Sequence, residues 1–169
     1  TAPEFANSWY FLGEGAMQEA ARLSQEGKQT AASKEYGFAA KAWANYLEQY
    51  GPTHLQGVRQ MEDGGKVEFE TKSWLAGQAY QKGDRKSAYK LAKWVAKASP
   101  GDAQAWNNYA FFSREIGSDE ESLEAYRKAA ELSPDDPQIL NDMALILHYN
   151  LKRDLQEAAL LYARAIELA

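Results

Sequence analysis

The stretch Ala105–Pro134, AWNNYAFFSREIGSDEESLEAYRKAAELSP, determines the predicted fold of this chain. Trp106 stands near its start, Gly117 lies at its middle and Pro134 ends it. Small residues recur between these points, at Ala110, Ser122 and Ala129. Apolar residues at intervals of three and four indicate amphipathic helices, and glycine and proline are typical of helix ends. The stretch therefore predicts two helices joined by a tight turn.

The same pattern recurs along the chain at a fixed period. Pro134 lies 34 residues after Pro100, and both follow a serine. Equivalent small residues have the same spacing, in the pairs Ala76 and Ala110, Gly83 and Gly117, and Ala88 and Ser122. A third copy follows, with Ala158, Tyr162 and Ala165 two residues late, so we expect a longer turn at 150–154. A repeat of this length indicates helical hairpins that stack on one another.

These residues resemble the tetratricopeptide repeat (TPR) family, whose period is 34 residues. The resemblance is carried by Trp106, Tyr109, Ala110, Ser122, Tyr126, Ala129 and Pro134. It implies an all-α fold, a right-handed superhelical solenoid of antiparallel helix hairpins, in a single domain over 1–169. The clear repeats are predicted at 69–102, 103–136 and 137–169.

The first part of the chain is irregular. Residues 5–52 match a hairpin with about 15 extra residues, which we assign to an extended first hairpin with Thr30 as a helix N-cap. The alternative is a structureless loop at 24–36. Residues 53–68 are predicted to be an insertion that holds a short helix and then a break at Asp63-Gly64-Gly65.

Individual residues of the repeat at 103–136 predict how its two helices end and pack. Gly117 suits a left-handed helix C-terminus, and Ser118 with Glu121 resembles a capping box. The small residues at 110, 122 and 129 are expected to let two helix axes approach closely. The rings of Trp106 and Tyr126 are expected to fill the space between neighbouring hairpins.

Composition argues against several classes of function. The formal net charge of -5 disfavours nucleic acid as a partner, because phosphate binding needs a basic field. With no cysteine and only two histidines, His54 and His148, the sequence offers no thiolate site and no catalytic or metal-binding motif. No apolar run is long enough to cross a membrane. We therefore expect a non-enzymatic protein without a cofactor or a metal.

The resemblance implies binding of a protein or an extended peptide by the first helix of each repeat, as a scaffold or adaptor. Asparagine amides suit a peptide backbone, because they donate and accept hydrogen bonds. Aromatic rings at neighbouring positions suit its side chains. The predicted peptide-binding residues are Trp74, Tyr80, Asn107, Asn108, Phe111, Asn141, Asp142 and Tyr149.

Two other functions remain open from the sequence. One is a self-assembly module, a homo-oligomer formed through the C-terminal edge, where Leu161, Ile166 and Leu168 are apolar and terminal repeats are normally polar. The other is the recognition arm of a larger protein. The chain begins Thr-Ala-Pro-Glu, so either a leader is removed or a longer protein precedes it. The compartment, cytoplasmic or exported, stays open.

Overall fold

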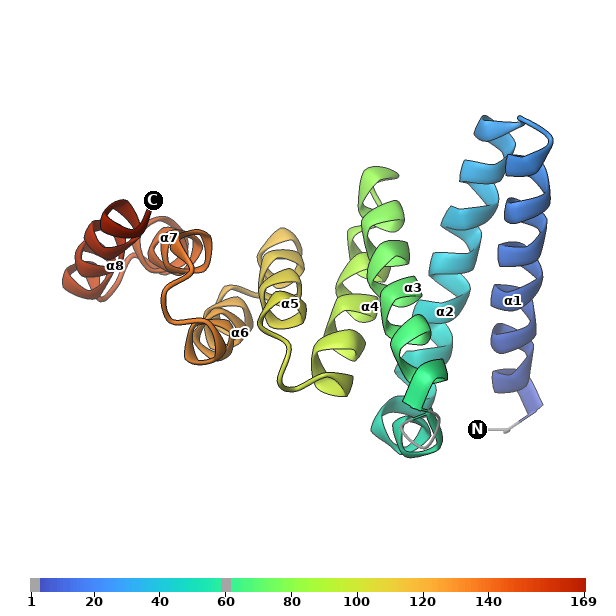
Figure 1. Ribbon diagram of the computed structural model, residues 1–169, viewed down its shortest axis with the longest axis horizontal. Coiled ribbons are helices and arrows are strands. Elements are labelled where there is room, and N and C mark those ends of the chain that lie inside the picture. Colours follow the sequence, from blue (N-terminus) through green and yellow to red (C-terminus); the bar gives the residue numbers. More distant parts are fainter. Residues whose placement is uncertain (1–3, 59–61) are drawn as a thin grey trace. The chain divides into compact units, whose positions relative to one another are not determined.

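The helical periodicity of the sequence is realised as antiparallel pairs of helices (Figure 1). The computed structural model describes residues 4–58 and 62–169, with side chains at 8–49 and 72–169. The chain divides into two compact units, Thr1–Ala98 and Ser99–Ala169, here called the first and the second unit. The predicted all-α class of helical hairpins is confirmed, whereas the predicted repeat boundaries stay a prediction.

The first unit begins with the long hairpin that the sequence predicts. Helix α1 is Glu4–Gln25 and helix α2 is Gln29–Val58, and α1 packs along α2 (Figure 1). The alternative of a structureless loop at 24–36 is wrong, because only three residues separate the helices. Thr30 lies inside α2, so its assignment as an N-cap is also wrong.

The second hairpin of the first unit pairs α3, Glu62–Gln81, with α4, Arg85–Ala98, and both helices pack on α2. Helix α2 continues through Pro52 to Val58, where the sequence predicted a separate short helix. The predicted break at Asp63-Gly64-Gly65 is wrong, because α3 includes these residues. Each glycine costs a helix only about 1 kcal/mol, which the packing of a 20-residue helix overrides.

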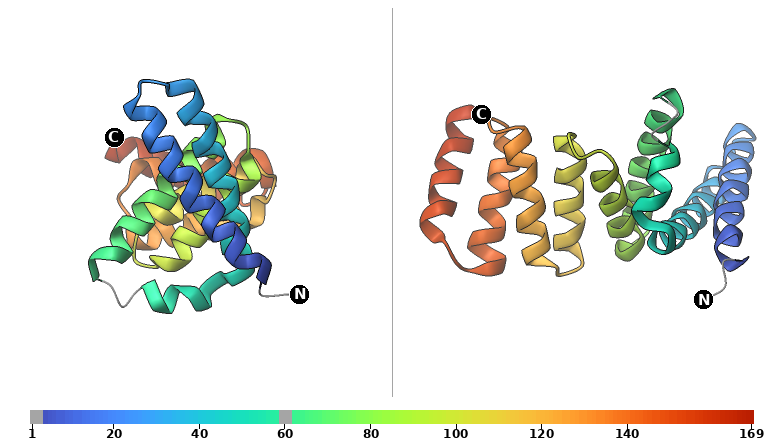
Figure 2. Two further views of the ribbon diagram at one scale, coloured as in Figure 1. Left: turned by 90° about the vertical axis from the view of Figure 1, so that its right-hand side faces the viewer. Right: turned by 90° about the horizontal axis from the view of Figure 1, so that it is seen from below.

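The second unit stacks two shorter hairpins, whose antiparallel helices Figure 2 shows side by side. Helix α5 is Ala103–Glu115 and α6 is Asp119–Leu132. Helix α7, Pro137–Leu145, continues directly into a π-helix, η1, at Ile146–Leu151. Helix α8, Leu155–Leu168, packs back on α7.

Small residues set the spacing of α5 and α6, as predicted. The Ser122 hydroxyl donates a hydrogen bond of 2.7 Å to the carbonyl oxygen of Ala110, and both residues are fully buried. Tyr126 is also fully buried. Trp106 is only half-buried, and its Nε1 donates to the carbonyl oxygen of Pro100 at 3.0 Å. Of the two predicted rings, Tyr126 is therefore the one enclosed in the core.

The turns between paired helices use glycine in a left-handed conformation. Gly117 has φ +80, and the N–H of Ser118 donates to the carbonyl oxygen of Ser113 at 2.9 Å across it. Gly83 has the same φ at the equivalent position, which confirms the predicted role of this spacing. The predicted capping box does not form. The Ser118 side chain makes no hydrogen bond to the helix N-terminus, and Glu121 accepts from the Tyr109 hydroxyl instead.

The last hairpin turns without glycine. Lys152 and Asp154 have φ of 52 and 49, a region that non-glycine residues seldom adopt. The predicted longer turn at 150–154 is wrong, because three residues separate η1 from α8, as three separate α5 from α6. The two extra residues of the last repeat lie in its first helix, since α7 and η1 have 9 and 6 residues where α5 has 13.

Gly13 and Gly15 of α1 give a matched test of packing in the first unit. A Cβ at Gly13 would lie 2.7 Å from Nε1 of Trp43, which is only 2% exposed, whereas a Cβ at Gly15 would meet nothing within 4 Å. We expect Gly13→Ala to destabilise the unit by about 1–3 kcal/mol through overpacking. Gly15→Ala should stabilise it by about 0.5–1 kcal/mol, since alanine favours a helix. Thermal or urea unfolding checks both, and equal effects would contradict this packing.

Candidate peptide-binding surface

The predicted binding residues lie on the first helix of each hairpin, but in two different units. Trp74 and Tyr80 belong to α3 of the first unit. The others belong to α5, α7 and η1 of the second unit, namely Asn107, Asn108, Phe111, Asn141, Asp142 and Tyr149. Each unit is therefore considered by itself.

On α7 the structure brings two predicted residues together and adds a third. Asn141 Nδ2 donates to Oδ1 of Asp142 at 3.4 Å, and the Tyr126 hydroxyl donates to Oδ2 of the same carboxylate at 3.5 Å. Both bonds are long, so the carboxylate keeps capacity to accept further donors. Sequence reasoning assigned Tyr126 to packing alone, and its spacing from Asp142 gives no signal of this contact.

Burial governs the acidity of Tyr126. Desolvation, and secondarily the Asp142 carboxylate, hold the pKa of the Tyr126 phenol above its usual value. Arg114 acts in the opposite direction and Glu115 in the same direction, so these charges surround the phenol. The hydroxyl therefore stays protonated and acts as a donor toward α7.

On α5 the two asparagines differ in their environment. Asn107 is only 7% exposed, and within the described chain its buried Oδ1 has no hydrogen-bond donor. Asn108 is half-buried, and its Oδ1 accepts from Nε2 of Gln104 at 3.0 Å. A buried acceptor without a donor is costly, so Asn107 is the polar group of this surface that most needs a partner.

Apolar contacts flank these amides. Phe111 is half-buried, packs edge-on against Phe112 at 5.2 Å between ring centroids, and lies 5.2 Å from the Arg114 guanidinium carbon. Tyr149, on η1, is 62% exposed and lies 4.2 Å from the His148 ring. Both predicted rings are accessible at the surface, Phe111 one helical turn after Asn107 on α5 and Tyr149 on η1.

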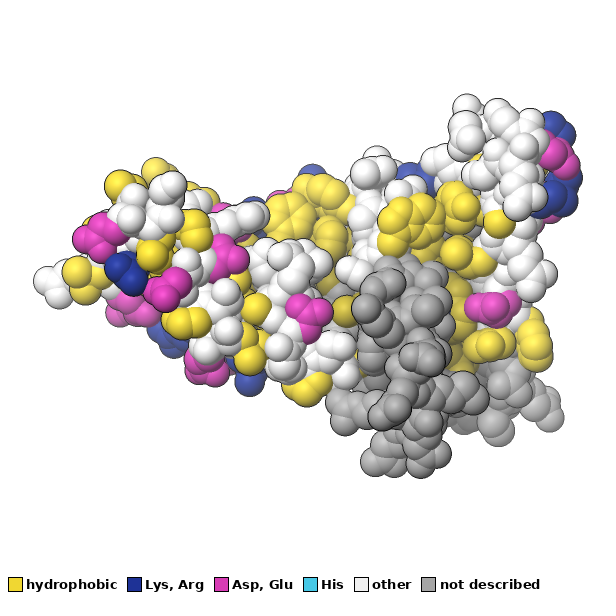
Figure 3. All heavy atoms as spheres, viewed as in Figure 1, with side chains coloured by type: hydrophobic (Ala, Val, Ile, Leu, Met, Phe, Trp, Pro, Cys, Tyr) yellow, Lys and Arg dark blue, Asp and Glu magenta, His cyan; other side chains and the backbone are white. Residues whose placement is uncertain are grey.

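In the first unit the two predicted aromatic residues lie six residues apart on α3 and differ in exposure. The Trp74 indole is 44% exposed and meets the Tyr36 ring edge-on at 4.6 Å. Tyr80, about 1.7 helical turns further along α3, is half-buried. Hydrophobic side chains gather at the surface over α2 and α3 (Figure 3).

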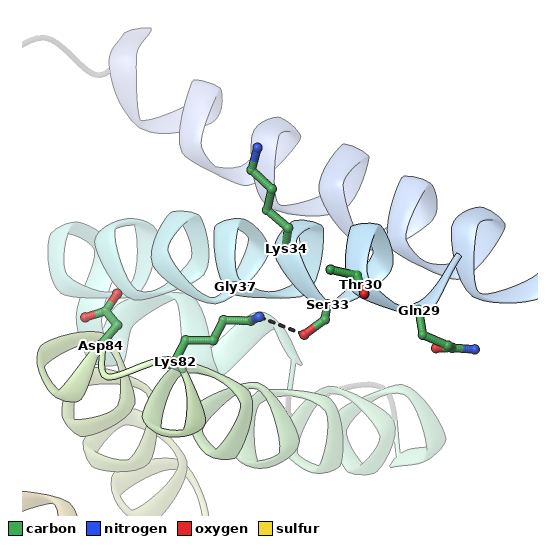
Figure 4. Close-up of a pocket in the computed structure, with 8 residues that line it drawn as sticks. Gln29, Thr30, Ser33, Lys34, Gly37, Lys82 and Asp84 are labelled. Carbon is green, nitrogen blue, oxygen red and sulfur yellow. Dashed lines mark hydrogen bonds between the residues drawn. The ribbon is translucent and has the colours of Figure 1, made fainter. Parts of the chain in front are cut away.

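The first unit also has a pocket that sequence reasoning missed. Its volume is about 670 Å³, and it lies between the first turns of α2 and the turn from α3 to α4 (Figure 4). The Lys82 amine donates to the Ser33 hydroxyl at 2.7 Å, and Asp84 accepts from the N–H of Ser87 at 3.1 Å. Because these polar groups already have partners inside the fold, the pocket is a weaker candidate than the surface around Asn107.

Two further observations concern the described residues only. None of their His, Asp and Glu side chains gather in threes as a metal site would require. No described helix combines the length and the apolarity that crossing a membrane requires.

The stacked hairpins, with polar and aromatic residues on their first helices, define the class of this chain as a helical repeat protein.

The comparisons with known proteins agree with this class. Residues 113–150 match the model of the TPR repeat family, which confirms the resemblance predicted from the sequence. No protein with a curated function matches the chain. The fold and the family match together support a protein-interaction scaffold in general.

Solved structures of MamA share the fold. A MamA RS-1 double mutant has a TM-score of 0.56 and 16% sequence identity, over 93% of this chain and 94% of that chain. A fragment described as MamA 41-end from Desulfovibrio magneticus RS-1 has a TM-score of 0.55 and 15% identity, with the same shares covered. At such identities the similarity establishes the arrangement of helices and nothing about ligands.

The raised pKa of Tyr126 predicts an alkaline loss of stability. The phenol is neutral in the folded chain, whereas in the unfolded chain it ionises near its usual pKa of about 10. The protonated phenol therefore makes its full contribution to the free energy of unfolding below about pH 10. That contribution is lost as the pH rises above this value. Tyr126→Phe removes this contribution, so its melting temperature should fall less between pH 8 and pH 11 than that of the wild type. Tyr149→Phe, at an exposed ring, is the control, and equal falls in all three proteins would refute the assignment.

Proposed function

We propose that the chain is a non-enzymatic scaffold whose second unit binds an extended peptide along α5, α7 and η1. The observation that carries the proposal is the buried Oδ1 of Asn107, which lacks a donor in the described chain. A backbone N–H of a bound peptide would supply that donor after a rotation of the Asn107 side chain brings its Oδ1, which is closed to solvent in this structure, to the surface. The gain in binding free energy from this hydrogen bond is larger than it would be for an exposed amide. The buried acceptor has already lost its contact with water, so binding adds no further desolvation cost.

The other polar groups fit the same ligand. Asn108 on α5 and Asn141 on α7 are half-buried amides. Asn108 Oδ1 already accepts from Gln104 and Asn141 Nδ2 donates to Asp142 through a long bond, but each amide has further donor or acceptor capacity for a ligand. Asp142 is engaged only through long bonds to Asn141 and Tyr126. A peptide backbone, which alternates N–H and C=O groups, is the chemistry that such a mixed set recognises.

Side chains of the ligand would meet Phe111 and Tyr149, which flank the amides on α5 and η1. Exposed aromatic rings bury apolar area with little loss of conformational entropy. Trp74 and Tyr80 of the first unit are proposed as a second contact area for the same class of ligand. Arg114 and Asp142 carry opposite charges on this surface, so no strong net charge is required of the peptide.

The proposal is tested by selecting binders from a random peptide library on the wild-type chain. Their affinity is then measured for a variant with Asn107, Asn108 and Asn141 changed to alanine. We expect the variant to bind about 100-fold more weakly, because three hydrogen bonds are lost. Calorimetry or fluorescence anisotropy gives the two dissociation constants.

A matched control changes three exposed amides of the first unit, Gln18, Gln25 and Gln49, to alanine. This variant should bind as the wild type does, and circular dichroism should show the same helicity for all three proteins. If no peptide is selected, or if both variants bind equally well, the assignment of this surface is wrong.

A further inference from the structure

Helix α8 carries an apolar stripe along one face. The stripe is formed by Leu155, Ala159, Tyr162 and Ile166, which follow one another at intervals of four, three and four residues. Leu155 is 56% exposed and Ile166 is 77% exposed. Hydrophobic side chains are visible at the surface over α8 (Figure 3). Below, these four residues are called the α8 stripe.

The preceding hairpin shows what such a stripe does. Ala158, Tyr162 and Ala165 of α8 are equivalent to Ser122, Tyr126 and Ala129 of α6. The equivalent stripe of α6 is therefore Asp119, Leu123, Tyr126 and Ala130. Helix α7 packs on α6, and its Asp142 contacts the Tyr126 hydroxyl.

The two stripes differ in exposure and in composition. On α6, Leu123 and Tyr126 are 2% and 0% exposed because a helix covers them. On α8, Tyr162 is only half-buried. Its hydroxyl is nevertheless shielded from solvent and, in the described chain, has no hydrogen-bond partner. The α8 stripe is also the more apolar, with Leu155 and Ile166 where α6 has Asp119 and Ala130. A face of this kind fits another helix.

We propose that the α8 stripe packs against the α8 stripe of a second copy of this chain, antiparallel and about a two-fold axis. The stripe is self-complementary in this arrangement. Its large ends meet each other, Leu155 against Ile166 of the second copy. In the middle, the small Ala159 of one copy receives the Tyr162 ring of the other.

The charges at the two ends of α8 select the antiparallel arrangement. Lys152 and Arg153 precede the helix, and Glu167 lies in its last turn. Antiparallel packing places Glu167 beside Lys152 and the N-terminal end of the second helix, where a negative charge is favourable, whereas Arg153 already binds Glu120 of its own chain. Parallel packing would bring the two Glu167 carboxylates together. The inference is independent of peptide binding, because the α8 stripe contains none of the residues proposed for that function.

Sedimentation of the chain tests the proposal. The wild type should form a dimer at about 100 µM, a weak affinity typical of a small interface. Ile166→Glu should raise the dimer dissociation constant by about 100-fold, because two unpaired carboxylates would be buried in each dimer. A wild type that stays monomeric at about 500 µM overturns the proposal. The α8 stripe would then be covered by another protein or by another segment of a longer chain.

Leu160→Glu is the matched control. Leu160 is 73% exposed, close to the 77% of Ile166, but it lies outside the stripe, about a third of a turn around α8 from Ile166. The dissociation constant of this variant should stay within about twofold of the wild-type value. An equal effect of both substitutions would show that the α8 stripe is not the interface.

Cross-linking tests the two-fold geometry separately, because the chain has no native cysteine. With the axis midway along the stripe, the two copies of Ala159 approach to a Cα separation of about 6 Å, within the range of a disulfide. Ala159→Cys should therefore form a disulfide-linked dimer under mild oxidation. Ala21→Cys, at an exposed position on α1, should not. Equal cross-linking of the two variants would refute the antiparallel arrangement.

Discussion

The close approach of paired helices at small residues is the constraint on which the second unit depends. The Ser122 hydroxyl reaches the Ala110 carbonyl oxygen only because neither residue holds the helices apart. With α5 and α6 this close, a ring cannot lie between them, so Tyr126 points toward the next hairpin instead. There its hydroxyl meets Asp142, and one packing constraint thereby sets a polar contact in the candidate peptide-binding surface.

What the sequence predicts well follows from local geometry. Gly83 and Gly117 both have φ of +80, a conformation for which glycine has no steric cost, so their common spacing fixed the turns. Prediction failed where contacts with other helices outweigh local preference. Helix α2 continues through Pro52, and α3 includes Gly64 and Gly65, although each residue disfavours a helix. Helix α2 packs against α1, α3 and α4, and α3 packs against α2 and α4. The preferences of single residues do not include the stabilisation that these contacts between helices provide.

In the candidate surface, too, the sequence predicts the helix that carries each residue but not the environment of its side chain. The period alone assigned Asn107, Asn108 and Asn141 to the first helix of a hairpin, and the structure has them on α5 and α7. The period did not distinguish the buried, unsatisfied Asn107 from its neighbour Asn108, which Gln104 already satisfies. That difference depends on which side chains lie within 3 Å or so, and therefore on the packing of the whole unit.

The irregular turn before α8 decides how the last helix is presented. Lys152 and Asp154 adopt left-handed conformations that cost about 1 kcal/mol or more each, so other contacts must hold the turn. Those contacts run to the acidic first turn of α6. Arg153 makes two hydrogen bonds, of 2.8 and 2.7 Å, to the Glu120 carboxylate, and Asn150 donates to Asp119 at 2.9 Å. A paired arginine fork has a defined direction, which a single flexible ion pair lacks. Because the turn is fixed on α6 in this way, the outward direction of the α8 stripe belongs to an anchored helix and not to a frayed chain end.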